Sequence, residues 1–251
     1  MSKVNIWVRP ARPAVAVPNV KIIDMGFDPT SLSLTGFWRA SYSGAPWVPT
    51  ASAGTSGANG NLVAGPPAAN VGASVAGYTP ADFDGATTFL TNVSDATTLY
   101  TVGAGTILCL FKARSSVASL GTVFQDATLI RDTNSDVGIS FTNSGLTAYA
   151  FSGGYKTVTT ACTTGAYHLV MMRWDSTTLG LTIDSGAEST VACGALSVMI
   201  GTCVVGQGYV TGGPKYIDGT IFELATMNSK ASNGNYSGFK LYCNAKYGIS
   251  L

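Results

Sequence analysis

The sequence predicts an all-β protein, a sandwich of antiparallel strands, on three observations. Short runs of Val, Ile, Thr and aromatic residues recur at roughly eight- to twelve-residue spacing, with Gly, Ser, Asn and Asp between them. A hairpin pattern occupies residues 167–186. Near the C-terminus the apolar period changes from that of a strand to that of a helix, which predicts one helix packed on the sandwich edge.

The hairpin is the organising element of this prediction. Residues 167–174 are almost continuously apolar, which predicts a strand covered on both faces. Residues 175–178 form a polar turn. In the return strand Leu179, Leu181 and Ile183 alternate with small and polar residues, as in a half-buried strand.

Residues 1–22 are predicted to form an extended arm outside the core. Prolines at 10, 13 and 18 interrupt ladder pairing and favour extended backbone. A disordered tail is the alternative, although disordered tails are typically polar and charged, whereas this arm is apolar. We expect the arm to dock on a neighbouring subunit through Trp7, Val8, Pro10, Pro13, Val15, Val17 and Pro18.

Residues 23–251 are predicted to form a single sandwich domain. Its first strands are Ser31–Thr35 and Phe37–Tyr42, followed by a long irregular loop over 43–80 that Trp47 anchors. Further strands are predicted at 106–112, 121–125, 138–142, 146–151, 155–161, 196–200, 202–206 and 219–227, besides the hairpin. The spacing of Tyr236, Phe239, Cys243 and Tyr247 predicts the helix, over 235–247.

The composition restricts the class of protein. Charged residues make up 11% of the chain, its net charge is +1 and its mean hydropathy is +0.26. Such a low charge indicates surface buried against other subunits, as in a homo-oligomer or a larger assembly. It also argues against nucleic-acid binding, and no run reaches the ~20 apolar residues of a membrane helix. The five cysteines show no CxxC pair, which favours synthesis and folding in a reducing cytoplasm.

The order of several segments resembles that of a concanavalin A-like (LamG/laminin-G-type) jelly-roll β-sandwich. The segments are 83–85, 105–112, 164–170, 181–184, 200–201, 216–223 and 242–249. Residues 29–40 and the closing Lys246-Tyr247-Gly248-Ile249 are similar to variants found in bacteriophage virion proteins. The resemblance implies a domain that binds carbohydrate, binds protein or decorates a particle; a subset of the family are glycoside hydrolases.

Catalysis is not expected. A retaining glycosidase needs two carboxyl groups about 5 Å apart, and the only glutamates, Glu188 and Glu223, each lack a carboxylate two or four residues away. Asp175 and Asp184 are interpreted as turn residues, although hydrolysis by distant aspartates is not excluded. His168, the only histidine, is interpreted as a packed imidazole rather than the base of a Ser/His/Asp triad.

Two weak binding signals remain. Asp126, Asp132, Asn134 and Asp136 supply oxygen ligands for calcium, but solvated turns explain them more simply, so no cofactor is expected. Tyr149, Tyr155 and Tyr209, near Gly-rich turns, are candidate glycan contacts. We expect a non-enzymatic bacteriophage structural protein of the head or tail, with other virion proteins as partners. The alternative is a carbohydrate-binding module that attaches to a host-surface glycan.

Overall fold

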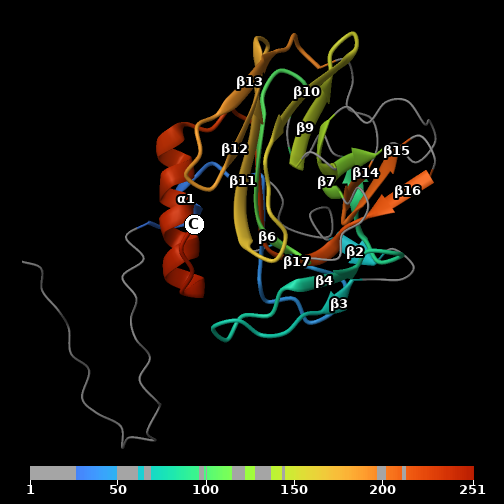
Figure 1. Ribbon diagram of the computed structural model, residues 1–251, viewed down its shortest axis with the longest axis vertical. Helices are drawn as coiled ribbons and strands as arrows, with labels where there is room; N and C mark the ends of the chain where they lie inside the picture. The colour runs from blue at the N-terminus through green and yellow to red at the C-terminus, as the bar shows by residue number, and fades with distance from the viewer. Residues whose placement is uncertain are drawn as a thin grey trace, which may run out of the picture.

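Two antiparallel sheets and one C-terminal helix make up the computed structural model of the protein (Figure 1). It describes residues 27–49, 62–64, 69–95, 99, 101–114, 122–127, 137–142, 145–196, 202–210 and 213–251. The predicted arm, residues 1–22, therefore lies outside the described residues, as do 50–61 and 65–68 of the predicted loop and 197–201, which include most of the predicted strand 196–200.

The helix-side sheet contains eight strands in the order β13–β12–β11–β6–β17–β4–β3, with β1 also paired to β17. Its strands are β1 Gly36–Arg39, β3 Asn70–Val71, β4 Ala81–Asp84, β6 Gly105–Ala113, β11 Tyr167–Trp174, β12 Thr178–Ile183, β13 Ser189–Ala192 and β17 Asp218–Met227. The predicted hairpin is thus β11–β12, which lies between the edge strand β13 and strand β6.

The second sheet contains seven strands in the order β10–β9–β8–β7–β14–β5–β2. They are β2 Leu62–Ala64, β5 Leu90–Asp95, β7 Thr122–Ala127, β8 Val137–Thr142, β9 Gly145–Phe151, β10 Tyr155–Thr160 and β14 Thr202–Val205. A separate two-stranded hairpin consists of β15 Gln207–Val210 and β16 Gly213–Tyr216.

The inner core fills the space between the two sheets. Alternate residues of β6 and β11, such as Cys109, Phe111, Val170 and Met172, point into it from the helix-side sheet. Ile139 of β8 meets them from the second sheet. Because side chains alternate along a strand, the remaining residues of β6 and β11 must find cover on the other face.

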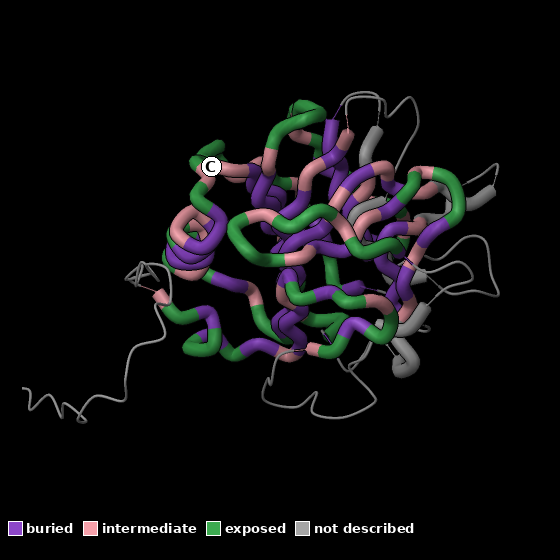
Figure 2. The backbone as a smooth tube through the Cα atoms, turned by 90° about the horizontal axis from the view of Figure 1, so that it is seen from below, coloured by how far each residue is buried: buried purple, intermediate pink, exposed green. Residues whose placement is uncertain are grey.

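That cover is the helix α1, Asn233–Tyr247, which lies on the outer face of the helix-side sheet (Figures 1 and 2). Leu108 and Leu110 of β6 and Leu169 and Met171 of β11 pack against its buried side. The prediction that residues 167–174 are covered on both faces is therefore correct. The predicted position of the helix at the sandwich edge is wrong, because the outward-facing apolar residues of the central strands require a layer over the face.

A β-bulge in β17 changes which side chains meet the helix. The register between β17 and β6 shifts between Ile221 and Glu223. Ile221 belongs to the inner core, whereas both Phe222 and Glu223 lie on the outer side. A bulge inserts one residue and re-aims the side chains that follow, and here it places a carboxylate beneath α1.

Two local predictions near the N-terminal end of the described chain need correction. The predicted strand Ser31–Thr35 is wrong: Pro29–Ser31 form a 3-10 helix that begins after Asp28, whose side chain accepts a hydrogen bond from the Thr30 amide. Proline fixes its own φ and lacks an amide hydrogen, which suits the start of a helical turn. The strand predicted at 37–42 is β1, Gly36–Arg39.

The predicted loop anchor, Trp47, is buried. Its indole nitrogen donates to the Arg39 carbonyl oxygen at 2.8 Å, and its ring meets Tyr42 edge-on. The same region is not wholly irregular, because it contains β2 and β3. Helices in the described part of the chain are too short or too polar to cross a membrane.

Candidate functional site

Glu223 lies fully buried between α1 and the helix-side sheet. Its Oε1 accepts hydrogen bonds from the Lys246 ammonium and the Tyr247 hydroxyl, and from the Tyr242 hydroxyl at 3.3 Å. Burial raises the pKa of the Glu223 carboxyl, against the opposing effect of Lys246. No described residue hydrogen-bonds its Oε2. The Glu223 carboxylate links the sheet to α1 and is inaccessible to a substrate.

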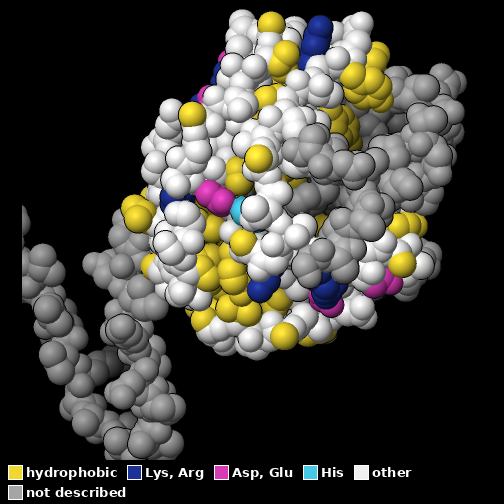
Figure 3. Space-filling view, viewed as in Figure 1, with side chains coloured by type: hydrophobic (Ala, Val, Ile, Leu, Met, Phe, Trp, Pro, Cys, Tyr) yellow, Lys and Arg dark blue, Asp and Glu magenta, His cyan; other side chains and the backbone are white. Residues whose placement is uncertain are grey.

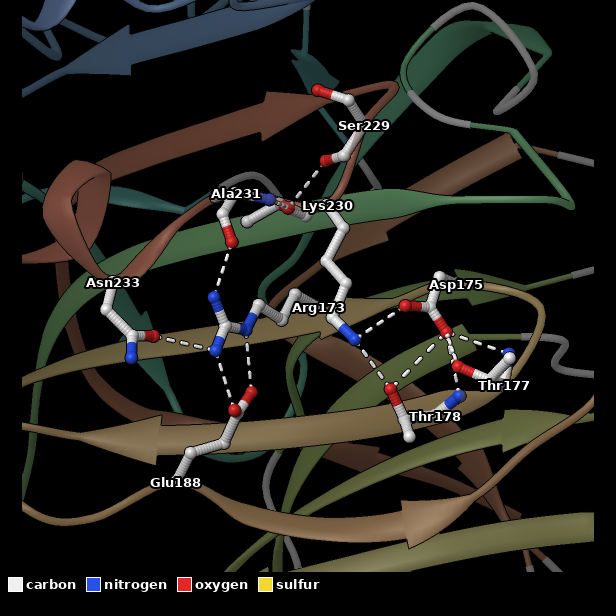
Figure 4. A network of polar contacts seen from close by, with 10 residues as sticks. Arg173, Asp175, Thr177, Thr178, Glu188, Ser229, Lys230, Ala231 and Asn233 are labelled. Carbon is white, nitrogen blue, oxygen red and sulfur yellow. Dashed lines mark hydrogen bonds and ion pairs between the residues drawn. The ribbon is translucent and has the colours of Figure 1, made fainter.

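Glu188, the other glutamate, is partly exposed and is paired with Arg173 (Figure 4). Its two oxygens accept from Nε and Nη2 of Arg173, both at 2.6 Å, a bidentate pair. The same guanidinium donates to the Ala231 carbonyl oxygen and to Oδ1 of Asn233. Gly180 makes room for this arrangement, since a Cβ there would lie 2.0 Å from Oε1 of Glu188. The cluster ties β11 to the start of α1.

Asp175 closes the β11–β12 turn, as the sequence predicts. Its Oδ1 accepts from the amides of Thr177 and Thr178, each at 2.8 Å. Lys230 adds an ion pair of 2.6 Å to the other oxygen and donates to the Thr178 hydroxyl (Figure 4). The turn is thereby linked to the segment that precedes α1.

His168 is a buried imidazole with acceptors on both sides. Nδ1 lies 2.7 Å from Asp184 Oδ2, and Nε2 lies 2.9 Å from the Thr163 carbonyl oxygen. Two acceptors are best satisfied when both ring nitrogens carry hydrogen. Burial lowers the pKa of His168, but the hydrogen bond to Asp184 and the nearby Cys162 outweigh it and raise the pKa to about 10. The imidazole is held as a charged donor, a poor state for a general base.

Asp184 does more than form a turn. Besides meeting His168, its Oδ1 accepts from the Leu169 amide at 2.9 Å, and its own φ is 54°. A left-handed backbone is unusual for a residue other than glycine, and Asp tolerates it better than most. The carboxylate thus links the end of β12 to the start of β11.

One of the four candidate calcium ligands lies in the described part of the chain. Asp126 lies on β7, while Asp132, Asn134 and Asp136 lie outside the described residues. In the described part of the chain, no three His, Cys, Asp or Glu side chains gather closely enough to hold a metal ion. The docking residues predicted between Trp7 and Pro18 also lie outside it.

Two of the three candidate glycan tyrosines lie together. The rings of Tyr149 on β9 and Tyr155 on β10 have centroids 6.4 Å apart. Phe151 joins them, with its ring 5.2 Å from that of Tyr155, which is 52% exposed. Tyr209 lies on β15, in a different sheet. Sequence analysis missed Phe151, although its position two residues after Tyr149 puts both on one face of a strand.

Hydroxyl groups lie on the same face as these rings. Thr157 is the cross-strand partner of Tyr149, and Thr159 that of Thr147, with their hydroxyls 2.8 Å apart. The Tyr149 ring lies across Gly138 of β8, where a Cβ would come within 2.2 Å of its hydroxyl oxygen. We call Tyr149, Phe151 and Tyr155 the aromatic cluster. Aromatic rings beside hydroxyl groups, on rigid strands, are suited to binding a sugar ring.

Charged side chains are sparse and scattered over the face of the molecule in Figure 3, rather than gathered in one patch. This distribution agrees with the low charge of the sequence, and the described side chains on that face form no basic surface for a polyanion.

Comparison with solved structures supports the fold. A mutant Trypanosoma rangeli sialidase with trans-sialidase activity matches 85% of the chain with a TM-score of 0.60 at 11% identity. The binding domain of botulinum neurotoxin serotype G matches 84% of it, with a TM-score of 0.57 at 11% identity. Domains LG4-5 of mouse laminin alpha1 match 58% of it, with a TM-score of 0.46 at 14% identity.

The sialidase and neurotoxin matches agree with the sandwich architecture of the chain. The chain spans 33%, 50% and 40% of the three matched chains, so it corresponds to part of each. No protein-family model and no curated protein matches the sequence. The two sheets and the helix confirm the predicted all-β jelly-roll sandwich. At these identities the likeness concerns the fold alone and establishes no enzymatic activity.

Proposed function

We propose that the chain is a non-enzymatic structural protein of a bacteriophage virion, attached to its neighbours through residues 1–22. The observation that carries the non-enzymatic part is the position of the two glutamates. Glu223 is sealed beneath α1, and Glu188 is paired with Arg173, so neither is available as the acid or nucleophile of a retaining hydrolase. The particle assignment rests on the apolar arm, the low charge and the sequence resemblance.

Deletion of residues 1–22 tests this proposal. The truncated protein should fold, because residues 27–251 supply two buried cores, one between the sheets and one beneath α1. It should be missing from purified particles that incorporate the full-length protein. Folding is checked by circular dichroism, and incorporation by mass spectrometry of separated heads and tails. Incorporation of the truncated protein at the full-length level would overturn docking through the arm.

A second function is supported by the aromatic cluster: binding of a host-surface carbohydrate. Exposed aromatic rings contribute stacking area at little entropic cost, and the neighbouring threonines offer hydrogen bonds. A glycan array with the wild type should give discrete positive signals that Tyr155→Ala abolishes. Leu241→Ala removes a similarly exposed apolar side chain from the distant helix and should leave them unchanged. A silent array with folded wild type would contradict this function.

A further inference from the structure

A cavity of about 230 Å³ opens on the outer face of the helix-side sheet. It is lined by Val75, Lys112, Arg114, Tyr167, Thr220 and Phe222, among others. Phe222 and Tyr167 also belong to or pack against the cluster under α1, so the cavity borders the helix-covered area. Neither the aromatic cluster nor the two glutamates take part in it.

The floor of the cavity is built on the sheet itself. Lys112 of β6 lies opposite Tyr167 of β11 on one side and opposite Thr220 of β17 on the other. Directly paired residues share a face, so the three side chains form a row across neighbouring strands. Phe222, two residues after Thr220 on β17, lies on the same face. A site on paired strands is held more rigidly than one on loops.

The outer wall comes from the segment before β4. Val75 and Tyr78 exchange two backbone hydrogen bonds, of 2.8 and 2.9 Å, which close a tight turn. The Tyr78 ring meets the Tyr247 ring at 5.5 Å and lies 4.4 Å from the Lys246 ammonium. The end of α1 therefore fixes the position of this wall.

Two cationic side chains, Lys112 and Arg114, line the cavity, and of these Arg114 is paired with carboxylates. Arg114 is bound by Asp82 and Asp218, and also donates to the Phe83 carbonyl oxygen at 2.7 Å. The Lys112 ammonium lies 5.0 Å above the Tyr167 ring and forms no ion pair with any described carboxylate. A cation–π contact at a partly exposed site is worth less than a charge-assisted hydrogen bond. Lys112 is thus the group in the cavity that an anion would stabilise most.

We propose that this cavity binds the carboxylate of an acidic monosaccharide, of the hexuronic acid class. One uncompensated ammonium matches a single negative charge, and the nearby Asp82 and Asp218 disfavour a doubly charged phosphate. The volume accommodates one ring rather than a chain. Tyr167 and Phe222 offer apolar surface to the ring, and Thr220 offers a hydroxyl. The proposal is independent of the particle assignment and of the aromatic cluster.

Binding of three probes to the full-length protein, followed by NMR titration, tests this site. D-Glucuronate carries both ring and carboxylate, D-glucose lacks the carboxylate, and acetate lacks the ring. Glucuronate should bind at least about tenfold more tightly than either of the other two. Equal binding of glucose would overturn the role of the carboxylate, equal binding of acetate would overturn the sugar, and no binding would overturn the site.

Matched variants locate the binding. Lys112→Gln should weaken glucuronate about tenfold or more, because it removes the charge while keeping a polar side chain. Lys156→Gln removes a lysine from β10 of the second sheet and should change nothing. Tyr155→Ala should also leave glucuronate binding intact, which separates this site from the aromatic cluster. Unchanged binding in folded Lys112→Gln would refute the assignment.

Discussion

At the scale of single residues, His168 shows how a buried charge is tolerated. The Asp184 carboxylate and the Thr163 carbonyl oxygen satisfy both ring nitrogens, so the imidazolium has no unpaired donor. Its folded-state pKa of about 10 lies above the ordinary 6.5. The folded protein therefore holds this proton more tightly than the unfolded chain does, and the pair stabilises the fold in a pH-dependent way.

We predict that His168→Gln destabilises the protein more at pH ~6 than at pH ~10. The contribution of the charged pair is complete below pH ~6.5 and disappears as the pH rises to about 10, since His168 then loses its charge in the folded state too. Urea unfolding of both proteins at the two pH values gives the difference. A penalty that stays the same at both would mean that His168 is neutral in the folded protein. Because the residue contacts neither proposed binding site, glycan binding by the folded variant should be retained.

Gly180 leaves open the space that the Glu188 carboxylate occupies. It is the cross-strand neighbour of Arg173, and the Glu188 carboxylate lies over it. Gly180→Ala should displace Glu188 and leave the buried guanidinium partly unpaired, at a cost of about 1–3 kcal/mol. Denaturant unfolding of the variant and of the wild type measures this loss of stability. Gly103→Ala, where a Cβ meets no atom within 4 Å, is the matched control and should stay within about 0.5 kcal/mol. Equal effects of the two variants would contradict this role of Gly180.

At the scale of elements, α1 has defined ends. Ser232 is the N-cap of a capping box with Asn235, and Gly248 ends the helix in the left-handed conformation with φ 65°. Between these ends Tyr236, Phe239 and Tyr242 face the sheet. The helix is thus positioned by its ends and by one buried stripe, and Glu223 adds a polar anchor beneath it.

Ser232→Ala should destabilise the protein by about 1 kcal/mol, because the Asn235 amide loses its acceptor. Ser237→Ala is the control: Ser237 is exposed within the same helix, and alanine favours helix there, so no loss is expected. Thermal unfolding followed by circular dichroism compares the two variants. If Ser237→Ala were as damaging as Ser232→Ala, the cap would not be the reason.

Some of these elements can be predicted from the sequence and others cannot. The helix and the strands β6 to β12, β14 and β17 follow from local periodicity, whereas β2 to β5, β13, β15 and β16 were not predicted. Residues 167–174 also indicate that both faces of their strand are covered. Periodicity does not say what covers them, so the helix was expected at the edge instead of on the face. The bulge at Phe222 and Glu223 depends on pairing with β6, which is 100 or more residues away in the chain. For the same reason the row of Tyr167, Lys112 and Thr220 could not be predicted, whereas Tyr149 and Tyr155, on neighbouring strands, could be suggested.

At the scale of the whole molecule, one sheet serves two hydrophobic cores. Leu110 packs under α1, while its neighbours Cys109 and Phe111 pack in the inner core. Loss of the helix would therefore expose the outer face of the same strands that hold the inner core together. This connectivity favours a single cooperative unit rather than a sandwich with a loosely attached helix.

We predict that the inner core and the helix unfold together. Trp38, Trp47 and Trp174 all lie in the inner core, so their fluorescence reports on it, whereas circular dichroism near 222 nm reports on α1. A Trp7→Phe background removes the tryptophan of the arm from the signal. The two probes should give coincident denaturation curves with one midpoint, as expected for two-state unfolding. A helix signal lost at clearly lower denaturant would show instead that the outer layer detaches while the sandwich persists.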